Sequence, residues 1–470
     1  MLFHCSKQYI RTLGLPYRRL FRSTINIFSI LGLEKELLIE VLSGSNFIAN
    51  NKKEYKMKKA LKLSATSHAY NIGGKEHTVV RLTFQNYKDG YEDDGSDVII
   101  YRREAPGFIF GYDEEEYFDC LPLPTTEEMI FRGRLPDLHT FCEYDDKTAE
   151  IGKVYAYWVG KGEIGEALTG PVAIKLRDSR VWWSYDKIVS KIYELKKQFP
   201  AIEMREVGKT VMGRPLLSLS VGNKSNMIAC VGAIHPGESG PEILLTALHD
   251  ILTSNPHTFD LCGIALLPVV NADIREKITL GAPWYIRKNE RGVDLNRNFD
   301  AHWEEVSYGY GLASDDPKSP TYRGPYPNSE PETQAVIEFI EYTKPHTVFS
   351  YHWLCSVCTD RLISSFAAKD DCEYKEKLHE TSLLYSKGFR EGAELFERSV
   401  NDVALSSSAG GFSTWLYKQG IVGFDLEMSE ELVEIFPSSK DITTHEMLSR
   451  ATAGHKQGLL NIIKLHSKKH

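Results

Sequence analysis

The 470-residue chain has little cysteine, no excess of positive charge and no long apolar segment. Its eight cysteines are scattered and only Cys355 and Cys358 lie close together, so neither a disulfide scaffold nor a zinc ribbon is expected. The net charge of −8 argues against a nucleic-acid-binding surface. No apolar stretch reaches the roughly 20 residues of a membrane-spanning helix. The composition therefore predicts a globular protein with no nucleic-acid partner and no membrane span, and it carries no signal for an oligomeric state.

Residues 1–56 differ in charge from the rest of the chain. They hold nine Lys or Arg against four Glu, a net of +5, which leaves about −13 for the remainder. The apolar stretch 25–33 is short, is followed at once by Glu34 and lacks a small-residue cleavage site, so no secretory signal is expected and a cytoplasmic location is predicted. An organellar transit peptide is an alternative interpretation, because the segment is rich in Arg. A third interpretation is that the segment is not native, because Lys53-Glu54 can be encoded as a purine-rich ribosome-binding sequence, and we hypothesise that translation starts at Met57.

Short runs of alternating polar and apolar residues occupy the next region. Residues 78–84, 97–102, 153–159 and 171–176 have this period of two and are separated by Gly, Asp and Pro turns, which predicts an all-β sandwich. The last two runs resemble the closing strands of a fibronectin type III-like domain. This resemblance is one of pattern and specifies no ligand. We expect a small β-sandwich domain over residues 57–178.

From residue 183 the pattern changes to strands separated by helices. Helices are expected at 186–198, 241–252, 331–342, 375–396 and 445–465, and strands at 216–221, 227–234, 347–351 and 421–428. Such alternation predicts an α/β domain over residues 183–470, with a mixed, mostly parallel twisted sheet sandwiched by helices. The predicted fold class is therefore α/β, preceded by a small all-β sandwich.

A metal site is suggested by three residues at the ends of two predicted strands. His235 and Glu238 follow the apolar run 227–234 and lie three positions apart, which lets an imidazole nitrogen and a carboxylate oxygen reach one ion. His352 follows the run 347–351 and therefore also sits at a strand end, where ligands collect in open α/β sheets. A catalytic zinc takes three such ligands and leaves one position to water. We expect one Zn²⁺ at His235, Glu238 and His352.

Further polar residues could act beside such an ion. Residues 423–428 alternate so that Asp425 and Glu427 share one face, and we take Glu427 as the candidate general base and Asp425 as structural. Arg287, Asn296 and Arg297 are close in sequence and could polarise a carbonyl and bind a carboxylate, since a guanidinium fork holds a carboxylate through two hydrogen bonds.

From about residue 183 to its end, the sequence resembles the carboxypeptidase A-like zinc peptidases. The resemblance rests on elements in the family's order: Tyr185, Gly213-Arg214-Pro215, His235-x-x-Glu238, Pro268-x-x-Asn271, Asp294-x-Asn296-Arg297-Asn298-Phe299, Ser329-Glu330-Pro331-Glu332-Thr333, His352, Gly410-Gly411-x-x-x-Trp415 and Glu427. The segments around Ser329 and Gly410 are most similar to the bacterial branch, which includes peptidases of cell-wall peptides. The resemblance implies a zinc carboxypeptidase fold.

The same resemblance implies a role for each matched residue. His235, Glu238 and His352 would hold the zinc, with Glu427 as general base and Arg287 at the oxyanion. Asn296 and Arg297 would bind the terminal carboxylate of a peptide substrate, and Asp294 would hydrogen-bond a ligating histidine. The implied reaction is hydrolysis of a C-terminal or near-terminal amide bond of a peptide, with cell-wall peptides among the substrate classes.

Several positions depart from the family's pattern, and two of them bear on substrate binding. Ser406 stands where the family usually has a substrate-capping tyrosine, and Tyr308, Tyr310 and Tyr417 are candidates to replace it. The position that tunes the terminal side-chain pocket falls near Ser413, which is neither charged nor bulky.

Two other functions stay open. A zinc deacylase of small N-acyl amino acids would share His-x-x-Glu and Asp-x-Asn-Arg, whereas the Ser-Glu-Pro-Glu-Thr and Gly-Gly-x-x-x-Trp segments favour the peptidase. A non-catalytic peptide-binding module would be marked by loss of zinc ligands or base, and the sequence retains all four residues.

Overall fold

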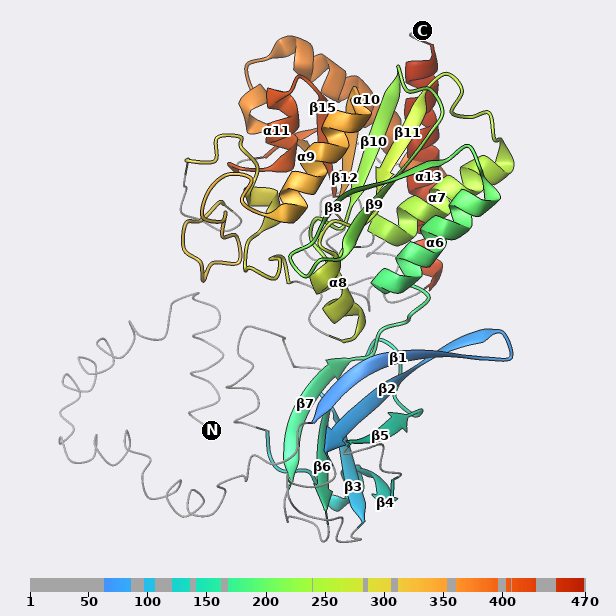
Figure 1. Cartoon of the computed structure of the whole chain (residues 1–470), viewed down its shortest axis with the longest axis vertical. Coiled ribbons are helices and arrows are strands. Elements are labelled where there is room, and N and C mark those ends of the chain that lie inside the picture. The colour runs from blue at the N-terminus through green and yellow to red at the C-terminus, as the bar shows by residue number, and fades with distance from the viewer. Residues whose placement is uncertain are drawn as a thin grey trace, which may run out of the picture. The chain divides into compact units, whose positions relative to one another are not determined.

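The computed structural model describes residues 63–85, 97–105, 121–135, 141–161, 168–238, 240–281, 286–305, 312–352, 361–395, 403–406, 408–427 and 445–468 (Figure 1). The basic segment 1–56, the start-site candidate Met57, and the tyrosines Tyr308 and Tyr310 lie outside these residues. Among the described residues, no helix combines the length and the apolar character needed to cross a membrane.

Among the described residues between Ser64 and Lys175, seven strands form two small antiparallel sheets. One has the order β1-β2-β5, from β1 (Ser64–Ile72), β2 (Lys75–Gln85) and β5 (Phe141–Asp146). The other has the order β4-β3-β6-β7, from β4 (Met129–Gly133), β3 (Val98–Glu104), β6 (Val154–Lys161) and β7 (Thr169–Lys175). Inward-facing residues of both sheets, such as Leu82, Ile100 and Tyr157, share one core. The all-β character of this region is confirmed, and its resemblance to a fibronectin type III-like domain stays a prediction.

The larger part of the chain is built on an eight-stranded sheet with the order β14-β13-β15-β12-β10-β11-β9-β8. Its strands are β8 (Glu203–Lys209), β9 (Pro215–Val221), β10 (Met227–Gly232), β11 (Gly263–Leu267), β12 (Thr347–Tyr351), β13 (Arg361–Ser364), β14 (Ala404–Leu405) and β15 (Val422–Glu427). The central neighbours β11, β10, β12 and β15 run parallel, whereas β8 and β9 pair antiparallel at one edge. The predicted mixed, mostly parallel sheet is confirmed.

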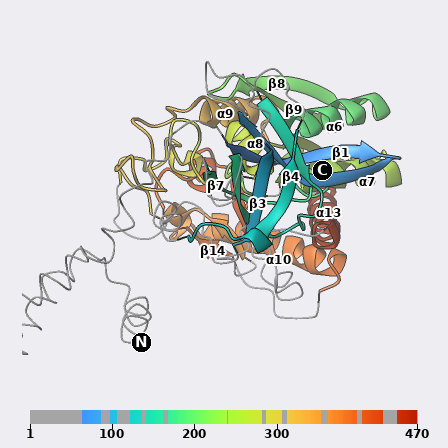
Figure 2. The ribbon, with the colours of Figure 1, turned by 90° about the horizontal axis from the view of Figure 1, so that it is seen from below.

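Helices cover both faces of this sheet. On one face, α7 (Gly240–Ser254) packs on β10 and on α13 (His445–Ser467), and α13 lies beside α10 (Cys372–Gly392) (Figure 2). On the other face, α9 (Pro331–Thr343) lies over β8, β10 and β11, and α11 (Phe412–Lys418) lies over β15. Two further helices, α6 (Tyr185–Gln198) and α8 (Ala272–Thr279), contact each other, and α6 also packs against α7.

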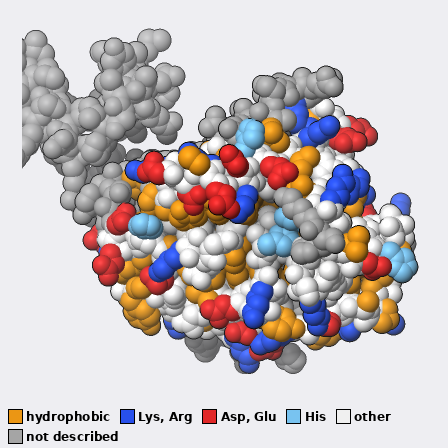
Figure 3. Space-filling model, turned by 90° about the horizontal axis from the view of Figure 1, so that it is seen from above, with side chains coloured by type: hydrophobic (Ala, Val, Ile, Leu, Met, Phe, Trp, Pro, Cys, Tyr) orange, Lys and Arg blue, Asp and Glu red, His pale blue; other side chains and the backbone are white. Residues whose placement is uncertain are grey.

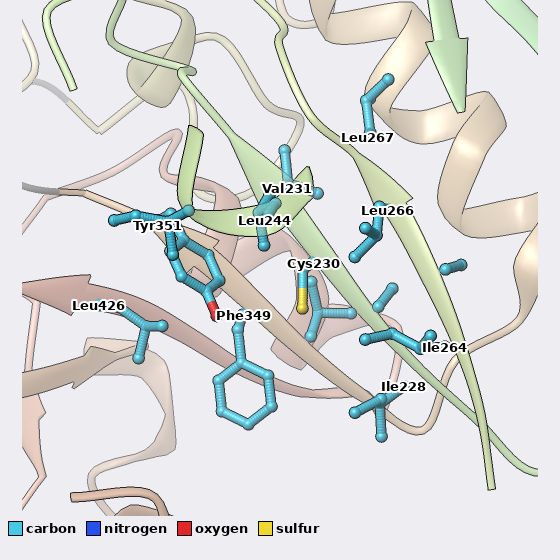
Figure 4. Packing of buried hydrophobic residues seen from close by; sticks show 14 of the residues in the cluster. Ile228, Cys230, Val231, Leu244, Ile264, Leu266, Leu267, Phe349, Tyr351 and Leu426 are labelled. Carbon is cyan, nitrogen blue, oxygen red and sulfur yellow. The ribbon is translucent and has the colours of Figure 1, made fainter. Parts of the chain in front are cut away.

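The central strands are apolar on both faces, as expected for parallel strands covered by helices on each side. Every residue of β10, β11 and β12 is buried. Cys230, Phe349 and Tyr351 lie close together in the core, and Leu244 of α7 approaches them (Figure 4). Shortening Phe349 to alanine in such a core typically costs about 3 to 5 kcal/mol.

The end of β10 differs from the expected strand 227–234. The strand stops at Gly232, and Ala233 turns into the left-handed region with a φ of 49°. A Cβ on Gly232 would lie 2.3 Å from Pro268 O, and one on Gly240 would lie 2.6 Å from the Cα of Gly232. The chain therefore turns where strand, loop and helix backbones approach too closely for a side chain. This turn starts the loop that carries His235.

Acidic and basic side chains of the described residues are interspersed on the face shown in Figure 3. Several of the charged groups pair at the surface, for example Lys224 with Glu203 at 2.7 Å and Arg205 with Glu338 at 2.6 Å. Exposed pairs of this kind contribute little, typically below about 1 kcal/mol each. These surface pairs therefore contribute little to the stability of the fold.

Candidate metal centre

The predicted ligands meet at the carboxyl ends of two neighbouring parallel strands. His235 follows β10, and His352 follows β12 directly and donates its backbone N–H to Leu426 O on β15 at 3.0 Å. Glu238 lies in the turn after His235, just before α7. Because the three strands are adjacent and parallel, residues far apart in sequence reach one edge of the sheet.

Three ligand atoms converge there. The Nδ1 atoms of His235 and His352 are 3.1 Å apart, and Glu238 Oε1 lies 3.0 Å from Nδ1 of His235. Glu238 Oε2 lies 3.0 Å from Nδ1 of His352 but without the geometry of a hydrogen bond. All three side chains are buried, and one atom from each falls within 4.8 Å of the others. Two imidazole nitrogens and a carboxylate aimed at one point are the donor set that a zinc ion takes, so the residues present fit that ion.

His235 is held from behind by a carboxylate. Its Nε2 lies 3.1 Å from Oδ1 of Asp294, which is fully buried and also accepts from the backbone N–H of Asn296 at 3.1 Å. Arg287 donates to Oδ2 of Asp294 from Nε at 3.2 Å and from Nη2 at 3.1 Å. A carboxylate behind a ligating histidine fixes the tautomer and the orientation of the ring. The expected place of Asp294 next to a ligating histidine therefore agrees with the geometry.

His352 has a different set of neighbours. Its Nε2 lies 2.9 Å from Ser350 Oγ and 3.4 Å from Oδ1 of Asp425. The other oxygen of Asp425 accepts from Ser413 Oγ at 3.1 Å. The sequence pattern indicates a structural role for Asp425 and does not reveal this contact with a candidate ligand histidine. The available signal was its position on the same strand face as Glu427.

The charges at this edge shift one another's pKa values. Burial alone would raise the pKa of Asp294, but Arg287 and His235 lower it well below its ordinary range. Burial alone would lower the pKa of Arg287, and the carboxylates of Asp294 and Glu238 raise it instead. Asp294 and Arg287 are therefore an ionised pair at neutral pH, although the aspartate has no exposure to water.

Glu427, the candidate base, is the last residue of β15, next to the strand that leads to His352. Its side chain is only half-buried, unlike the ligands. Glu427 is close enough to Arg287 to contribute to the raised pKa of that guanidinium. The structure thus brings the candidate base and the candidate oxyanion group to the same edge of the sheet.

Asn296 and Arg297 lie in a short 3-10 turn, η2 (Leu295–Arg297), which begins after Asp294. Asn296 Oδ1 accepts from the backbone N–H of Phe412 at 2.8 Å, so the amide nitrogen is the end that can donate to a ligand. Arg297 Nη1 donates to Asn296 O at 2.6 Å. Gly410 has a φ of 67°, and a Cβ there would lie 2.1 Å from Arg297 O. The first glycine of the Gly-Gly motif is therefore explained by close packing against the backbone of Arg297, whereas a Cβ on Gly411 would make only ordinary contacts, at 3.7 Å or more.

The two departures from the family pattern that bear on substrate binding lie on either side of this packing. Ser413 is buried in the first turn of α11 and donates to Asp425, so a carboxylate stands next to the position expected to tune the side-chain pocket. Ser406 follows β14, and its hydroxyl accepts from the backbone N–H of Ser408 at 3.1 Å. Tyr417 donates its hydroxyl to Asp371 at 3.2 Å and packs on Tyr374 of α10, which commits it to the packing of that helix.

Comparison with known proteins identifies the family of the α/β part of the chain. The family model described as zinc carboxypeptidase matches residues 188–447, which is more than half of the chain. The chain belongs to the zinc carboxypeptidase family. This membership and the His-Glu-His site together assign zinc as the metal of the centre.

Two curated relatives and one solved structure illustrate the similarity. Human carboxypeptidase A6 is 26% identical over 267 residues, which cover 51% of this chain and 58% of that protein. Murein peptide amidase A of Escherichia coli K12 is 31% identical over 153 residues, which cover 31% of this chain and 57% of that protein. The chain thus spans little more than half the length of either relative.

The solved structure of bovine thrombin-activatable fibrinolysis inhibitor in complex with tick carboxypeptidase inhibitor has a TM-score of 0.51 and 21% identity. The matched region covers 62% of the present chain and 99% of the chain in that solved structure. At this level of identity the likeness shows the fold, and it confirms the predicted zinc carboxypeptidase fold for the larger part of the molecule.

Proposed function

We propose that this protein is a zinc-dependent peptidase that hydrolyses an amide bond at or near the carboxyl end of a peptide. The observation that carries the proposal is the convergence of His235, Glu238 and His352 next to Glu427 on the adjacent strand. A zinc ion held there supplies a Lewis acid that lowers the pKa of bound water and polarises a carbonyl.

The protein's own groups perform the remaining steps. Glu427 takes a proton from the attacking water and passes it to the leaving amine nitrogen, which requires a carboxylate that is accessible rather than sealed in the core. Arg287 faces the negative charge that develops on the carbonyl oxygen, and Asp294 holds that guanidinium in place. Asp294 also keeps the His235 ring oriented, so one buried carboxylate orders two groups.

Substrate binding follows from the 3-10 turn after Asp294. The Asn296 amide nitrogen and the Arg297 guanidinium bind the terminal carboxylate of the substrate, because an amide and a guanidinium together match a carboxylate's acceptors. Burial lowers the pKa of Arg297, while Asp294 and Asp425 oppose that effect. The guanidinium remains charged, since arginine does not lose its proton in proteins.

A cell-wall peptide is the substrate class that we favour. The support is the similarity to murein peptide amidase A together with the segments around Ser329 and Gly410. The test is a mass-spectrometric screen of ordinary peptides, cell-wall peptide fragments and small N-acyl amino acids, with and without a chelator. Chelator-sensitive cleavage of cell-wall fragments is expected, and cleavage of small N-acyl amino acids alone would instead favour a deacylase.

Exopeptidase action is tested at Arg297. A buried charge-assisted pair is worth roughly 2 to 4 kcal/mol, so a peptide with an amidated carboxyl end should be cleaved about 30- to 1,000-fold more slowly than the free acid. Arg297→Ala should remove this difference by slowing only the free acid, whereas the matched control Arg297→Lys, which keeps the charge but not the fork, should retain part of it. Equal rates on acid and amide in the parent protein would indicate an endopeptidase.

A further inference from the structure

A fully buried arginine stands behind the loop that carries two of the metal ligands. Arg275 lies on α8 and has no exposure to water. Its Nη1 donates to Pro236 O at 3.0 Å and to Glu238 O at 2.9 Å. Its Nη2 donates to Glu242, an equally buried carboxylate in the first turn of α7. One guanidinium thus ties two carbonyls of the loop to the helix that follows it.

The segment between β7 and α6 contacts the same guanidinium. Arg275 lies over the ring of Trp182, with its guanidinium carbon 4.9 Å from the ring centre, and Arg177 lies 5.1 Å from the same ring. The backbone N–H of Trp183 donates to Glu242 at 2.7 Å. Arg177 in turn donates to Ile278 O on α8 at 2.7 Å. Residues 177–183 therefore contact both members of the Arg275 and Glu242 pair.

We propose that Arg275 is a positioning residue for the metal ligands and that Trp182 holds it in place. Arg275 does not reach the converging ligand atoms; it acts on the carbonyl of Glu238 and on the adjacent Pro236. A metal site tolerates ligand displacements of only about 0.5 Å, and a loop that begins with the strained Ala233 needs an external constraint to meet that tolerance.

Arginine suits this place because its planar fork offers several fixed donors and a flat face for an aromatic ring. A lysine could neutralise Glu242 but could not donate to two carbonyls and the carboxylate in the same geometry while stacking on Trp182. The segment that follows the β-sandwich is accordingly part of the support of the metal site, and not a passive connection.

The test measures the metal and not the reaction. The proposal rests on the proposed zinc site, so the zinc content of the parent protein is measured first, and a parent without zinc would defeat the proposed function instead of this inference. The double variant Arg275→Met with Glu242→Gln removes both buried charges together. We expect it to release zinc to a chromophoric chelator about 10- to 100-fold faster than the parent, as is typical when groups behind metal ligands are removed. The visible absorption spectrum of the cobalt-substituted protein should change as well.

A matched control separates positioning from general loss of stability. Arg102→Met breaks the ion pair between the half-buried Arg102 and the buried Asp146 in the β-sandwich, and it should leave the zinc release rate and the cobalt spectrum unchanged. Trp182→Leu should give a smaller acceleration than the double variant. A folded double variant with the parent's release rate and spectrum would overturn the proposal. If the double variant does not fold, Arg275→Lys decides the matter, and parent-like zinc release in that variant would equally overturn it.

Discussion

Two carboxylates in this molecule are buried to the same extent but differ in the hydrogen bonds that they accept. Asp146, at the end of β5 in the β-sandwich, and Glu238, at the metal centre, each have 1% of their surface exposed. Asp146 accepts from the backbone N–H and hydroxyl of Thr148 at 2.9 and 2.7 Å, and from Arg102 and Tyr157 at 2.9 Å each. Glu238 has one oxygen that makes no hydrogen bond and lies 3.0 Å from an imidazole nitrogen.

The difference distinguishes a carboxylate that stabilises the fold from one whose position suits it to bind a metal ion. A buried carboxylate is tolerated when every lone-pair direction finds a donor, and Asp146 meets that condition with four donors. One oxygen of Glu238 has no such donor, and a cation at the point where this oxygen and the two Nδ1 atoms converge would meet the condition. Removing charge at the metal edge should therefore cost function, and removing it in the β-sandwich should cost stability.

The largest effect is expected for Glu427→Gln, which keeps the shape of the base and removes its ability to accept a proton. General base catalysis contributes roughly 100- to 10,000-fold, so kcat should fall by that factor. Zinc content and thermal unfolding should stay at parent values, because the side chain is only half-buried and is not a ligand. Steady-state kinetics with metal analysis checks both parts, and a variant with parent-like kcat would place the base elsewhere.

The opposite pattern is expected for Asp146→Asn. Loss of charge-assisted hydrogen bonds from Arg102 and Tyr157 should lower the free energy of unfolding by about 2 kcal/mol, with kcat and zinc content unchanged. Denaturant unfolding measures the first quantity, and activity assays below the transition measure the second. A variant that loses zinc while remaining folded would break the proposed distinction.

The pH dependence of stability gives a second test of the role of Asp146. Burial alone would raise the pKa of Asp146, but the bonds from Thr148 and Tyr157 and the charge of Arg102 lower it below its ordinary value of 3.8. Because the folded-state pKa is depressed, the stabilisation is present above the ordinary pKa and is lost as pH falls through the folded value. Asp146→Asn should remove this part of the acid sensitivity, so the difference in stability between parent and variant should shrink as the pH falls below 3.8, the ordinary pKa.

The smallest effect is expected for Ser413→Ala, because Asp425 stands between the two kinds of carboxylate. One of its oxygens accepts from Ser413, and the other lies 3.4 Å from Nε2 of His352. Deleting the hydroxyl should lower the free energy of unfolding by about 1 kcal/mol and leave zinc bound. Denaturant unfolding of the parent and the variant, together with metal analysis, tests this prediction. Loss of zinc would mean that Ser413 supports His352 more strongly than its single hydrogen bond suggests.

Sequence reasoning could predict the parts of the site that depend on local pattern. Strand ends, the spacing of His235 and Glu238 and the alternation around Glu427 are readable along the chain, and the structure places these residues at one edge of the sheet. The sequence pattern does not predict helix α8, because its charged residues Asp273 and Arg275 are buried, each in an ion pair with a residue outside the helix. Charged residues on the buried face interrupt the helical periodicity of apolar residues from which a helix is predicted.

Contacts between distant elements could not be predicted in the same way. The contact of Asp425 with His352 depends on the pairing of β15 with β12, and that of Arg275 with the ligand loop depends on how α8 packs. The strands β13 and β14, with four and two residues, are too short to show a period. Such features follow from tertiary packing, which one sequence does not reveal.

The proposed function depends on a zinc ion held by the converging atoms of His235, Glu238 and His352. Metal analysis of the purified protein, before and after dialysis against a chelator, tests it most directly when the parent is compared with His352→Ala. We expect about one zinc per chain in the parent and loss of that zinc from a folded His352→Ala protein. A parent that is active without zinc, or a His352→Ala protein that retains a full equivalent of zinc, would contradict it.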